Sequence, residues 1–549
     1  MKTPLLIVSF LCLRLAVVAQ IPPPQFEWAR SMGGWQDDDL ADLVVAEDGS
    51  VYVTGSFKDF ICFDTLCFPA ASPDNSDIFL AKYDSVGVLQ WAKAWGGRGI
   101  DQGQKLFLNK EDYLYFAGNF TDTIQINGQT FKSYDKGFNP WEHSDILLLK
   151  LSPEGEIVQS FHAGGTSRDE VSSIEVDLSN RVYISGQFYS DSLRLDENVT
   201  LLKGSGIGSM FWAHFDAEGL VTNYHVFSSS GSTIPIIQQM SISKSYLFMI
   251  GAFEDSFIVD GNLLTTDQTV NYFLMKWDTE GRYIWSELFK GSDIWDMTLD
   301  ERGNIYFTGS MRDSVLFDTL FVNLGRAKYL ARYSSEGRVQ WVKKPVNGFF
   351  NNLSLFYNRG QLYLAGSFSH TITIGDSTFT SPREEQLLIA RYDTTGNLIW
   401  VRAIKNISDH RLLQIEGNSK GDVTLAGGYN YNGLFFDSTL VLNVFPAYMD
   451  VFVAQLHRES LPPLPQPPTE WAVYPNPFED HLFLWGDFVL GPLSLNLFDL
   501  SGREIWKTQM LIEDTIFPFR LSVPVLQGGF YLLRIGQGKR SVIKKMIKR

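Results

Sequence analysis

A short strand that ends in Gly-x-aromatic, or once in Gly-x-Met, recurs seven times along this chain. The copies follow one another at intervals of about 60 residues, and a fixed period of this length is the signature of a repeat architecture. The marker glycines are Gly55, Gly118, Gly186, Gly251, Gly309, Gly366 and Gly427. Because one repeat cannot bury its apolar face alone, the seven copies must stack on one another.

Each copy contains the pattern of four strands. A first strand leads into a polar turn such as 47–50, and the glycine-marked strand returns from it as a hairpin. A third strand such as 78–83 follows after a small extra hairpin, and a turn such as 84–87 leads into a fourth strand. The fourth strand carries Trp28, Trp91, Trp285, Trp341 or Trp400, with Gln159 and Asn223 at the equivalent places. Four antiparallel strands per repeat form a propeller blade, so we predict an all-β, seven-bladed β-propeller over residues 20–460.

The order of the strands predicts how the ring closes. The strand 26–31, which contains Trp28, precedes the first complete repeat. The seventh repeat ends after its third strand, 451–456, without a Trp strand of its own. We therefore expect the N-terminal strand 26–31 to complete blade seven, which would remove two open sheet edges.

These motifs resemble the bacterial seven-bladed β-propeller repeat family over residues 26–457. The resemblance rests on Trp91-Ala92-Lys93, Gly96-Gly97, the strand 51–57 and the strand 79–84. Blades three and four, which contain Gln159 and 243–246, depart most from the pattern. The resemblance implies a fold and an extracellular setting, but it implies no reaction.

The N-terminus predicts export. Residues 1–19 combine Lys2, an apolar core and the small residue Ala19, which is typical of a signal peptide cut after Ala19. A membrane anchor is the alternative, but the apolar core is shorter than the roughly 20 residues that a span needs. We expect no transmembrane segment elsewhere. The formal net charge of −16 argues against nucleic acid as a partner.

The two cysteines of the exported chain lie in one predicted hairpin. With Asp64-Thr65 as a two-residue turn, Phe63 faces Leu66, and Cys62 faces Cys67 in the closer, non-hydrogen-bonded kind of pair. We therefore predict a disulfide between Cys62 and Cys67, with two free thiols as the alternative.

A proline-rich linker at 461–469 separates a second domain, 470–549, from the repeats. Alternating apolar residues between Gly, Asn and Pro turns predict a small β-sandwich. Its motifs are Pro475-Asn476-Pro477, the turn from Asp499 to Gly502, and the strand that contains Gly529 and Tyr531. They resemble the type A C-terminal sorting domain of type IX secretion cargo in Bacteroidetes. The resemblance implies the type IX machinery as a partner and a secreted or outer-surface location, often with removal of the domain; a generic accessory β-sandwich is the alternative.

No sequence motif points to catalysis or to a cofactor. Acidic residues recur just after the Trp strands, at 37–39, Asp101, 169–170 and Asp293, with Asp42 and Asp296 nearby. No segment matches a calcium loop, so we favour solvated loops, with calcium as the alternative and no cofactor expected. The eight histidines form no metal-ligand motif.

The aromatic residues suggest where a ligand could bind. The regular Trp series is better explained by packing between blades than by stacking on sugars. Trp35, Trp141 and Trp295 break the repeat and are the candidate ligand-binding aromatics. The favoured hypothesis is a monomeric, non-enzymatic binding scaffold for a glycan or protein. The alternatives are a carbohydrate-active enzyme with acids from several blades, and a structural adhesin component.

Overall fold

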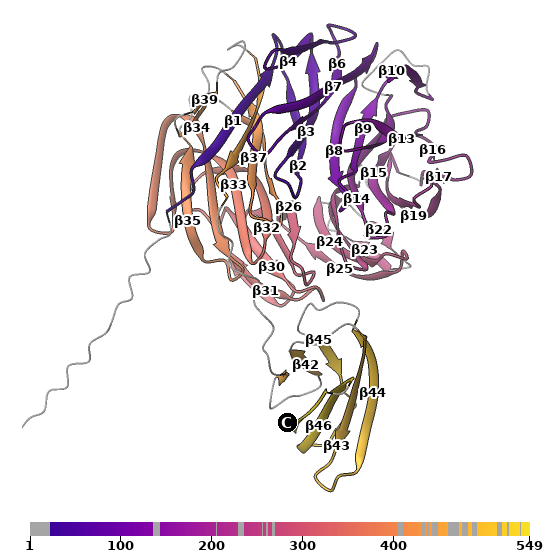
Figure 1. Ribbon diagram of the computed structural model, residues 1–549, viewed down its shortest axis with the longest axis vertical. Helices are drawn as coiled ribbons and strands as arrows, with labels where there is room; N and C mark the ends of the chain where they lie inside the picture. The colour runs from indigo at the N-terminus through magenta and orange to yellow at the C-terminus, as the bar shows by residue number, and fades with distance from the viewer. Residues whose placement is uncertain are drawn as a thin grey trace, which may run out of the picture. The chain divides into compact units, whose positions relative to one another are not determined.

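The computed structural model (Figure 1) divides the chain into two compact units, Met1–Ser460 and Leu461–Arg549. The structure describes residues 22–134, 143–204, 206–228, 235–254, 256–259, 262–265, 270–404, 410–430, 434–437, 439–441, 448–458, 471–474, 481–485, 491–512, 519–523, 526–538 and 540–548. The predicted signal peptide and the proline-rich linker lie outside these ranges. Every regular element within them is a strand, and all strand pairs are antiparallel, so the all-β prediction is confirmed. No helix that could cross a membrane occurs there.

Within the described residues, the first unit contains seven sheets built on the same four strands, numbered here in chain order; a further hairpin extends two of them to six strands. The strands of each sheet are given in hydrogen-bonded order. Sheets 1 to 3 are β2 (Asp39–Val45), β3 (Val51–Lys58), β6 (Ser76–Tyr83), β7 (Leu89–Gly97); β8 (Gln102–Leu108), β9 (Leu114–Phe120), β12 (Asp145–Leu151), β13 (Ile157–Ala163); and β14 (Asp169–Val176), β15 (Val182–Phe188), β18 (Ser209–Phe215), β19 (Val221–Ser228).

The remaining four sheets repeat the same order of strands. Sheets 4 to 7 are β20 (Ile236–Ser243), β21 (Tyr246–Phe253), β24 (Asn271–Asp278), β25 (Tyr283–Phe289); β26 (Ser292–Leu299), β27 (Ile305–Met311), β30 (Ala327–Tyr333), β31 (Val339–Lys343); β32 (Phe350–Asn358), β33 (Gln361–Ile374), β34 (Ser377–Asp393), β35 (Leu398–Ile404); and β36 (His410–Gly417), β37 (Val423–Tyr429), β40 (Asp450–Leu456), β1 (Phe26–Gly33).

The N-terminal strand β1 is the outer strand of sheet 7. It pairs with β40 from Phe26 opposite Leu456 to Met32 opposite Val451. The first strands of successive sheets also lie next to one another, from β2 through β8, β14, β20, β26 and β32 to β36, and β36 lies next to β2. The order of first strands therefore returns to its starting point.

A small hairpin is inserted between the second and third strands of each sheet. In sheet 6 it extends β33 and β34; elsewhere it is formed by β4 (Phe60–Phe63) and β5 (Leu66–Pro69), β10 (Thr123–Ile126) and β11 (Gln129–Lys132), β16 (Ser192–Arg194) and β17 (Thr200–Leu202), β22 (Ser256–Val259) and β23 (Asn262–Thr265), β28 (Ser314–Phe317) and β29 (Leu320–Asn323), and β38 (Leu434–Phe436) and β39 (Thr439–Val441). The first two hairpins pair with the outer strand of the preceding sheet, because β4 bonds to β1 and β10 bonds to β7. Such pairing ties neighbouring sheets together.

The Trp series packs each sheet against the next. The indole nitrogens of Trp28, Trp91 and Trp341 donate to the carbonyls of Ser85, Pro153 and Thr394, at 3.2, 3.3 and 3.2 Å. Each acceptor lies in the turn between the third and fourth strands of the following sheet. A Cβ on the turn glycine Gly87, which has a φ of 75°, would lie 2.5 Å from the Trp28 ring. These contacts agree with packing between sheets and occupy the faces that a sugar would need.

The exceptions in the Trp series keep the same hydrogen bond. Gln159 Nε2 donates to Glu218 O at 3.0 Å, and Asn223 Nδ2 donates to Glu280 O at 2.9 Å. An amide can replace the indole N–H as a donor, although it buries less apolar area.

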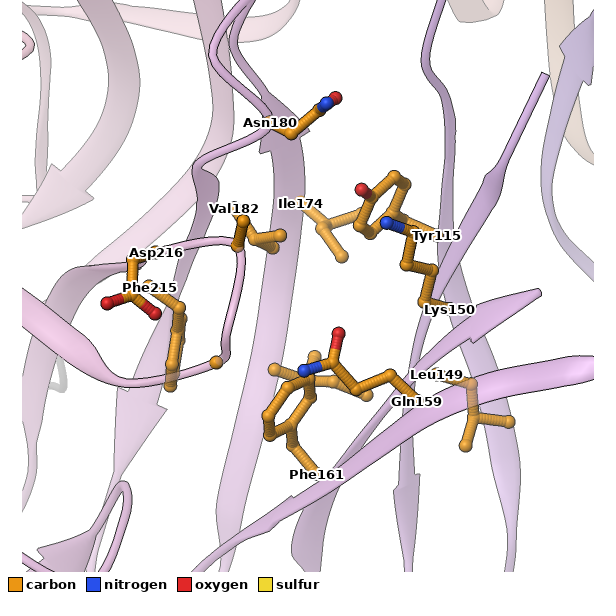
Figure 2. Close-up of a pocket in the computed structure, with 13 residues that line it drawn as sticks. Tyr115, Leu149, Lys150, Gln159, Phe161, Ile174, Asn180, Val182, Phe215 and Asp216 are labelled. Carbon is orange, nitrogen blue, oxygen red and sulfur yellow. The ribbon is translucent and has the colours of Figure 1, made fainter. Parts of the chain in front are cut away.

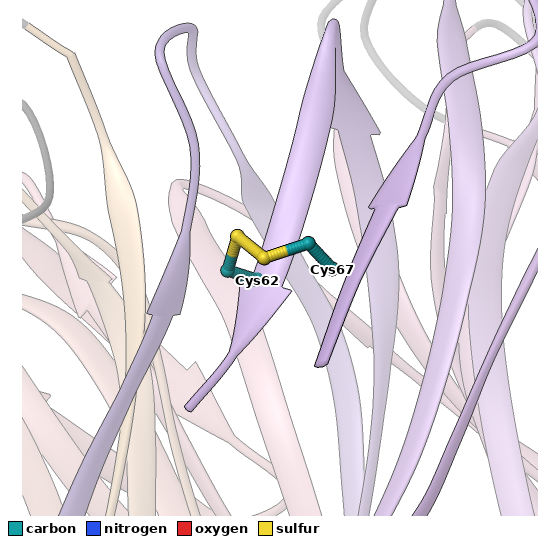
Figure 3. Close-up of a disulfide and its surroundings, with 2 residues drawn as sticks. All are labelled: Cys62 and Cys67. Carbon is teal, nitrogen blue, oxygen red and sulfur yellow. A yellow bond between two sulfur atoms is a disulfide. The ribbon is translucent and has the colours of Figure 1, made fainter. Parts of the chain in front are cut away.

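Cys62 and Cys67 lie directly opposite each other in the first inserted hairpin (Figure 3). Their Cα atoms are 4.1 Å apart and their sulfur atoms are bonded. Phe63 pairs with Leu66 across the turn, in which Asp64 has a φ of 53°. Asp tolerates this left-handed conformation better than most residues do.

Reduction of the purified exported protein is expected to add two hydrogen atoms to its intact mass, because the disulfide opens to two thiols. Mass spectrometry of the denatured protein with and without reductant measures this change. A Cys62→Ser variant is the control and should not gain mass. An unchanged mass in the parent protein would show that the two thiols are free.

The second unit contains two sheets that share a core. One sheet comprises β41 (Ala472–Tyr474), β42 (His481–Trp485) and β45 (Phe519–Ser522); the other comprises β44 (Glu504–Ile512), β43 (Gly491–Phe498), β46 (Gly529–Gln537) and β47 (Arg540–Lys548). Trp471, which precedes β41, and Leu484 of the first sheet pack with Leu495 and Leu533 of the second. The two antiparallel sheets therefore share one apolar core.

The motifs noted in this unit lie at its turns and in its core. Asp499 Oδ1 accepts hydrogen bonds from the backbone of Ser501 and Arg503 at 2.9 and 3.1 Å, which shapes the turn that Gly502 completes. Gly529 begins β46, and the hydroxyl of the buried Tyr531 donates to Gln527 O at 2.7 Å. Residues 475–477 lie outside the described residues.

Candidate functional site

The side chain at one equivalent position of the first strand connects a sheet to the next one in six of the seven sheets. This position follows a β-bulge, where an extra residue re-aims the side chains beyond it. The residues at this position, called the belt residues below, are Asp42, Lys105, Ser173, Gln239, Asp296, Ser354 and Gln414.

Six of the seven belt residues accept a hydrogen bond from the backbone of the following sheet. Asp42 accepts from Leu106 N at 2.8 Å. The other five bonds run from Met240 N to Ser173, Met297 N to Gln239, Leu355 N to Asp296, Ile415 N to Ser354 and Leu43 N to Gln414, at 3.2, 2.8, 2.7, 3.2 and 3.1 Å. The last bond joins sheet 7 to sheet 1. A belt of side-chain acceptors therefore runs through all sheets except at Lys105.

Lys105 is the exception because an ammonium group cannot accept a hydrogen bond. Between sheets 2 and 3, the hydrogen bond is accepted by Asn119 Oδ1 instead, from Val171 N at 3.1 Å. Lys105 Nζ instead lies 3.9 Å from Asp42 Oδ1. The ammonium group of Lys105 can therefore face the acidic belt residues.

Four carboxyl groups with raised pKa values lie on the first strands of sheets 1, 3, 5 and 7, and the charge of Lys105 acts on three of them, Asp42, Asp296 and Glu416. Burial, followed by the charge of Asp42, raises the pKa of Glu175 to about 8. Burial and the charges of Asp42 and Asp296 raise the pKa of Glu416 well above its usual value. Burial also raises the pKa of Asp42 and Asp296, although Lys105 and backbone N–H groups act in the opposite direction. Such carboxyl groups can hold protons near neutral pH, which general acids require.

A polar hollow of about 320 Å³ lies where sheets 2, 3 and 4 meet. Its polar lining consists of Gln104, Asn119, Glu170, Ser172, Gln187 and Gln238, with Val171, Ile236 and Ile237 as the apolar part. Gln104, Ser172 and Gln238 are the bulge residues of β8, β14 and β20. Because the bulge turns these side chains out of the regular alternation, three sheets can present them to one hollow.

The hollow offers hydrogen-bond acceptors in a fixed arrangement. Glu170 Oε1 accepts from Arg168 Nε at 2.7 Å, and its Oε2 accepts from Gln187 Nε2 at 2.7 Å. The amide oxygens of Gln187 and Gln238 are buried and have no hydrogen-bond partner within the described residues. Buried polar atoms normally find a partner, so these two oxygens are suited to accept from hydroxyl or amide donors of a ligand.

The three aromatic candidates fall at different places. Trp35 is 59% exposed between sheets 7 and 1, where its ring packs edge-on against Phe60. Trp295 is the bulge residue of β26, so it holds on sheet 5 the position that Gln238 holds on sheet 4. Its ring lies 3.6 Å from Lys328 Nζ. Trp141 lies outside the described residues.

Sequence reasoning missed the amide residues of the hollow. Gln104, Gln187 and Gln238 are unremarkable in the repeat, and a bulge leaves little trace in the pattern of a single strand. Their one common signal is a long amide side chain near the start of neighbouring sheets, where the other sheets carry small or apolar residues.

A second, much smaller hollow of about 20 Å³ lies between sheets 2 and 3 (Figure 2). Phe161, Ile174 and Phe215 surround it, and Gln159 reaches into it from the place where most sister strands carry Trp. Replacement of a large indole by an amide accounts for this space, so we assign the hollow to packing.

For three of the acids after the Trp strands, the structure contradicts the expectation that they are solvated. Asp38, Asp101 and Asp169 are fully buried, whereas Asp39 is exposed. The backbone N–H groups of the three buried acids donate to Met449 O, Ser76 O and Ser144 O of the preceding sheet, at 2.8, 2.7 and 2.8 Å. These bonds draw the acidic segments into the junctions between sheets. Within the described residues, no group of three His, Cys, Asp or Glu side chains could hold a metal ion.

Comparisons with known proteins identify the end of the chain. Residues 472–549 match the family of secretion system C-terminal sorting domains, which confirms the assignment made from the motifs. The chain is 20% identical over 436 residues to the uncharacterized WD repeat-containing protein L264 of Acanthamoeba polyphaga mimivirus, covering 64% of this chain and 31% of that protein. It is 27% identical over 189 residues to the regulatory protein FlaEY of Caulobacter vibrioides, covering 33% and 19%. The chain thus spans less than a third of the length of either relative.

Among solved structures, a Synechocystis apocarotenoid oxygenase mutant is similar with a TM-score of 0.35 and 10% identity. The match covers 80% of this chain and 95% of that one. A protein of unknown function from Bacteroides caccae is similar with a TM-score of 0.32 and 8% identity, covering 59% and 89%.

Proposed function

We propose that residues 20–460 form a seven-bladed β-propeller that acts as a non-enzymatic binding scaffold on the cell surface or in the medium. The sorting domain at 472–549 marks the protein as secreted or surface-located, and it implies interaction with the type IX secretion machinery. Three observations support the propeller: seven equivalent sheets, first strands that return to their starting point, and a belt bond from Leu43 to Gln414 between sheets 7 and 1. The similarity to a protein named for WD repeats is consistent with it.

The ligand that fits the polar hollow best is a glycan. The observation that carries this proposal is the pair of buried amide oxygens, on Gln187 and Gln238, that have no partner within the described part of the chain. Neutral sugars are rich in hydroxyl donors, and amide side chains with a fixed carboxylate recognise them through hydrogen bonds. Trp295, at the next bulge, could add an apolar face for a sugar ring.

A Gln187→Ala/Gln238→Ala variant is expected to bind its glycan about tenfold or more weakly, since each lost hydrogen bond is worth about 1 kcal/mol. A glycan array probed with the exported protein identifies the ligand, and calorimetry measures both affinities. Gln340→Ala, on an exposed part of β31, is the matched control and should bind like the parent. An array without any bound glycan, or equal affinities of parent and variant, would contradict the proposal.

A carbohydrate-active enzyme remains the second candidate. It is favoured by the four carboxyl groups on the first strands of sheets 1, 3, 5 and 7, whose pKa values are raised. Glycoside hydrolysis uses a pair of carboxyl groups, one of them protonated. Screening the protein against polysaccharides for newly released reducing ends separates this candidate from a binding scaffold.

A further inference from the structure

Buried aspartates meet in pairs at three consecutive junctions between sheets. In each pair, one residue begins the third strand of a sheet and the other lies at the start of the next sheet. The pairs are Asp450 with Asp38, Asp77 with Asp101, and Asp145 with Asp169, and all six side chains are at most 3% exposed. Two carboxylates in such a place repel each other and lose their hydration, so at least one charge at each junction must be compensated.

The pair between sheets 1 and 2 shows how the carboxyl groups are held. Asp77 Oδ2 accepts from Ala71 N at 2.7 Å, and Asp101 Oδ1 accepts from Thr121 N at 3.3 Å. The Asp77 carboxyl fills space beside Gly96, where a Cβ would lie 1.9 Å from its Cγ. One oxygen of each carboxyl, Asp77 Oδ1 and Asp101 Oδ2, is buried without a hydrogen-bond partner within the described residues.

At the junction between sheets 2 and 3, a histidine lies beside the pair of buried carboxyl groups and can compensate one of the charges. His162 Nε2 lies 2.6 Å from Asp145 Oδ2, so a protonated imidazole can neutralise that carboxylate. His162 stands opposite Leu147 on the outer strand, and the residue at the same register in sheet 1 is Ala94, opposite Phe79. The first junction therefore lacks this basic side chain.

In the part of the chain that the structure describes, no other charged side chain takes the place of the histidine at the first junction. The charged residues at the ends of the neighbouring elements are Lys58 at the end of β3, Asp74 before β6, Arg98 after β7 and Asp122 after β9. Lys82, Lys93 and Lys105 lie farther along β6, β7 and β8. Within the described ranges, neither Lys58 nor Arg98 forms an ion pair with Asp77 or Asp101. Burial, the charge of Asp77 and that of Asp122 raise the pKa of Asp101 well above its usual value. Burial raises the pKa of Asp77 to about 6.

We propose that Asp77 and Asp101 hold one proton between them at neutral pH, and that the contact between sheets 1 and 2 weakens as the pH rises and this proton is lost. The bond of 2.7 Å from Asp101 N to Ser76 O brings the two residues to the same junction, and each carboxyl has one buried oxygen that can carry the proton. A calcium ion would need six to eight oxygen ligands, and the known neighbours of these carboxyls are N–H donors. Loss of the proton leaves two buried negative charges side by side, which favours separation of the sheets and entry of water.

The direction of the pH dependence follows from the raised pKa values. Because the pair binds its proton more tightly in the folded than in the unfolded chain, its contribution to stability is complete below the unfolded pKa of about 4. It declines as the pH rises through the folded pKa values, of which that of Asp77 is about 6. The junction is thus a built-in sensor for alkaline conditions.

Thermal unfolding of the exported protein between about pH 5 and pH 9 tests whether Asp77 and Asp101 hold such a proton. The Tm of the parent should fall by several degrees as the pH rises. In Asp77→Asn, the side chain is neutral at every pH, so the greater part of this fall should disappear. Asp74→Asn changes an exposed carboxyl of the same loop and should keep the parental pH dependence. Ala94→His should raise the Tm if its imidazole contacts Asp77 as that of His162 contacts Asp145.

Infrared spectroscopy detects protonated carboxyl groups directly. A purely structural role of Asp77 would not change this absorption. Because other buried carboxyl groups such as Glu175 also have raised pKa values, the readout is a difference spectrum. The absorption of protonated carboxyl groups at neutral pH should be weaker in Asp77→Asn than in the parent. Should Asp77→Asn fail to fold, Asp101→Asn offers the same test from the other side. An identical pH dependence of parent and Asp77→Asn would overturn the proposal. So would a rise of the parental Tm with calcium that Asp77→Asn lacks, because the pair would then bind a metal ion.

Discussion

Deletion of residues 20–33 is expected to abolish the cooperative unfolding transition of the first unit. These residues contain β1, which is the outer strand of sheet 7 and bonds to β40 along its length. The deletion also removes Trp28, whose indole contacts two sheets. It donates to Gln455 Oε1 of sheet 7 at 3.0 Å and packs on Gly87 of sheet 1. The deletion would leave β40 as an open edge and would separate sheets 7 and 1.

The expected loss is comparable to the whole stability of the unit. Truncation of one buried aromatic side chain costs about 3–5 kcal/mol, and most domains are stable by about 5–15 kcal/mol. Trp28→Ala should therefore lower the Tm clearly, and the full deletion should leave no single transition. Calorimetry and near-ultraviolet circular dichroism measure both effects.

Removal of residues 461–549 is the control for this experiment. It takes away the second compact unit but none of the strands of the seven sheets, so the transition of the first unit should persist. A chain without residues 20–33 that melts like the parent would contradict the role of β1 in closing the ring.

Deletion of residues 470–549 is expected to stop transport across the outer membrane in a host with type IX secretion. This segment contains the match to the family of secretion system C-terminal sorting domains. Without it, the machinery has no signal to bind, and the first unit should accumulate in the periplasm. Cell fractionation with antibodies against the first unit gives the distribution between periplasm, surface and medium.

A fusion protein shows whether the sorting domain is sufficient for export. Residues 462–549 fused to a periplasmic reporter should carry it to the surface or the medium. In the same fusion, Asp499→Ala removes the carboxylate that accepts from Ser501 and Arg503 and should reduce export by loosening the turn. A reporter that stays in the periplasm of a competent host would refute the role of this domain.

Local patterns predicted much of the fold. The strand–turn–strand units, the inserted hairpins and the antiparallel pairing all depend on residues that are close in the sequence. The opposition of Cys62 and Cys67 is an example, because a two-residue turn at Asp64-Thr65 sets the register of its hairpin. The regular Trp positions predicted packing for the same reason, since each repeat places its indole at the same point of the fourth strand.

The candidate site was harder to predict because it depends on contacts between repeats. Gln104 and Gln238 meet in one hollow only because bulges in β8 and β20 turn them out of the alternation. Gln187 joins them from the second strand of the sheet that lies between. Residues so far apart in the chain leave no common pattern in a single sequence.

The sequence by itself determined that the chain is all-β, that it repeats seven times, and that it ends in a sorting domain. Periodicity, turn residues and short motifs carry this information, because they act through neighbouring residues. Only the tertiary structure decided which of the acidic side chains are buried. Asp77 and Asp101 look like polar loop residues, yet the backbone bond from Asp101 N to Ser76 O and the space beside Gly96 bury them together. Burial is a property of the assembled sheets, and it changes a solvated charge into a group that must find a proton or a cation.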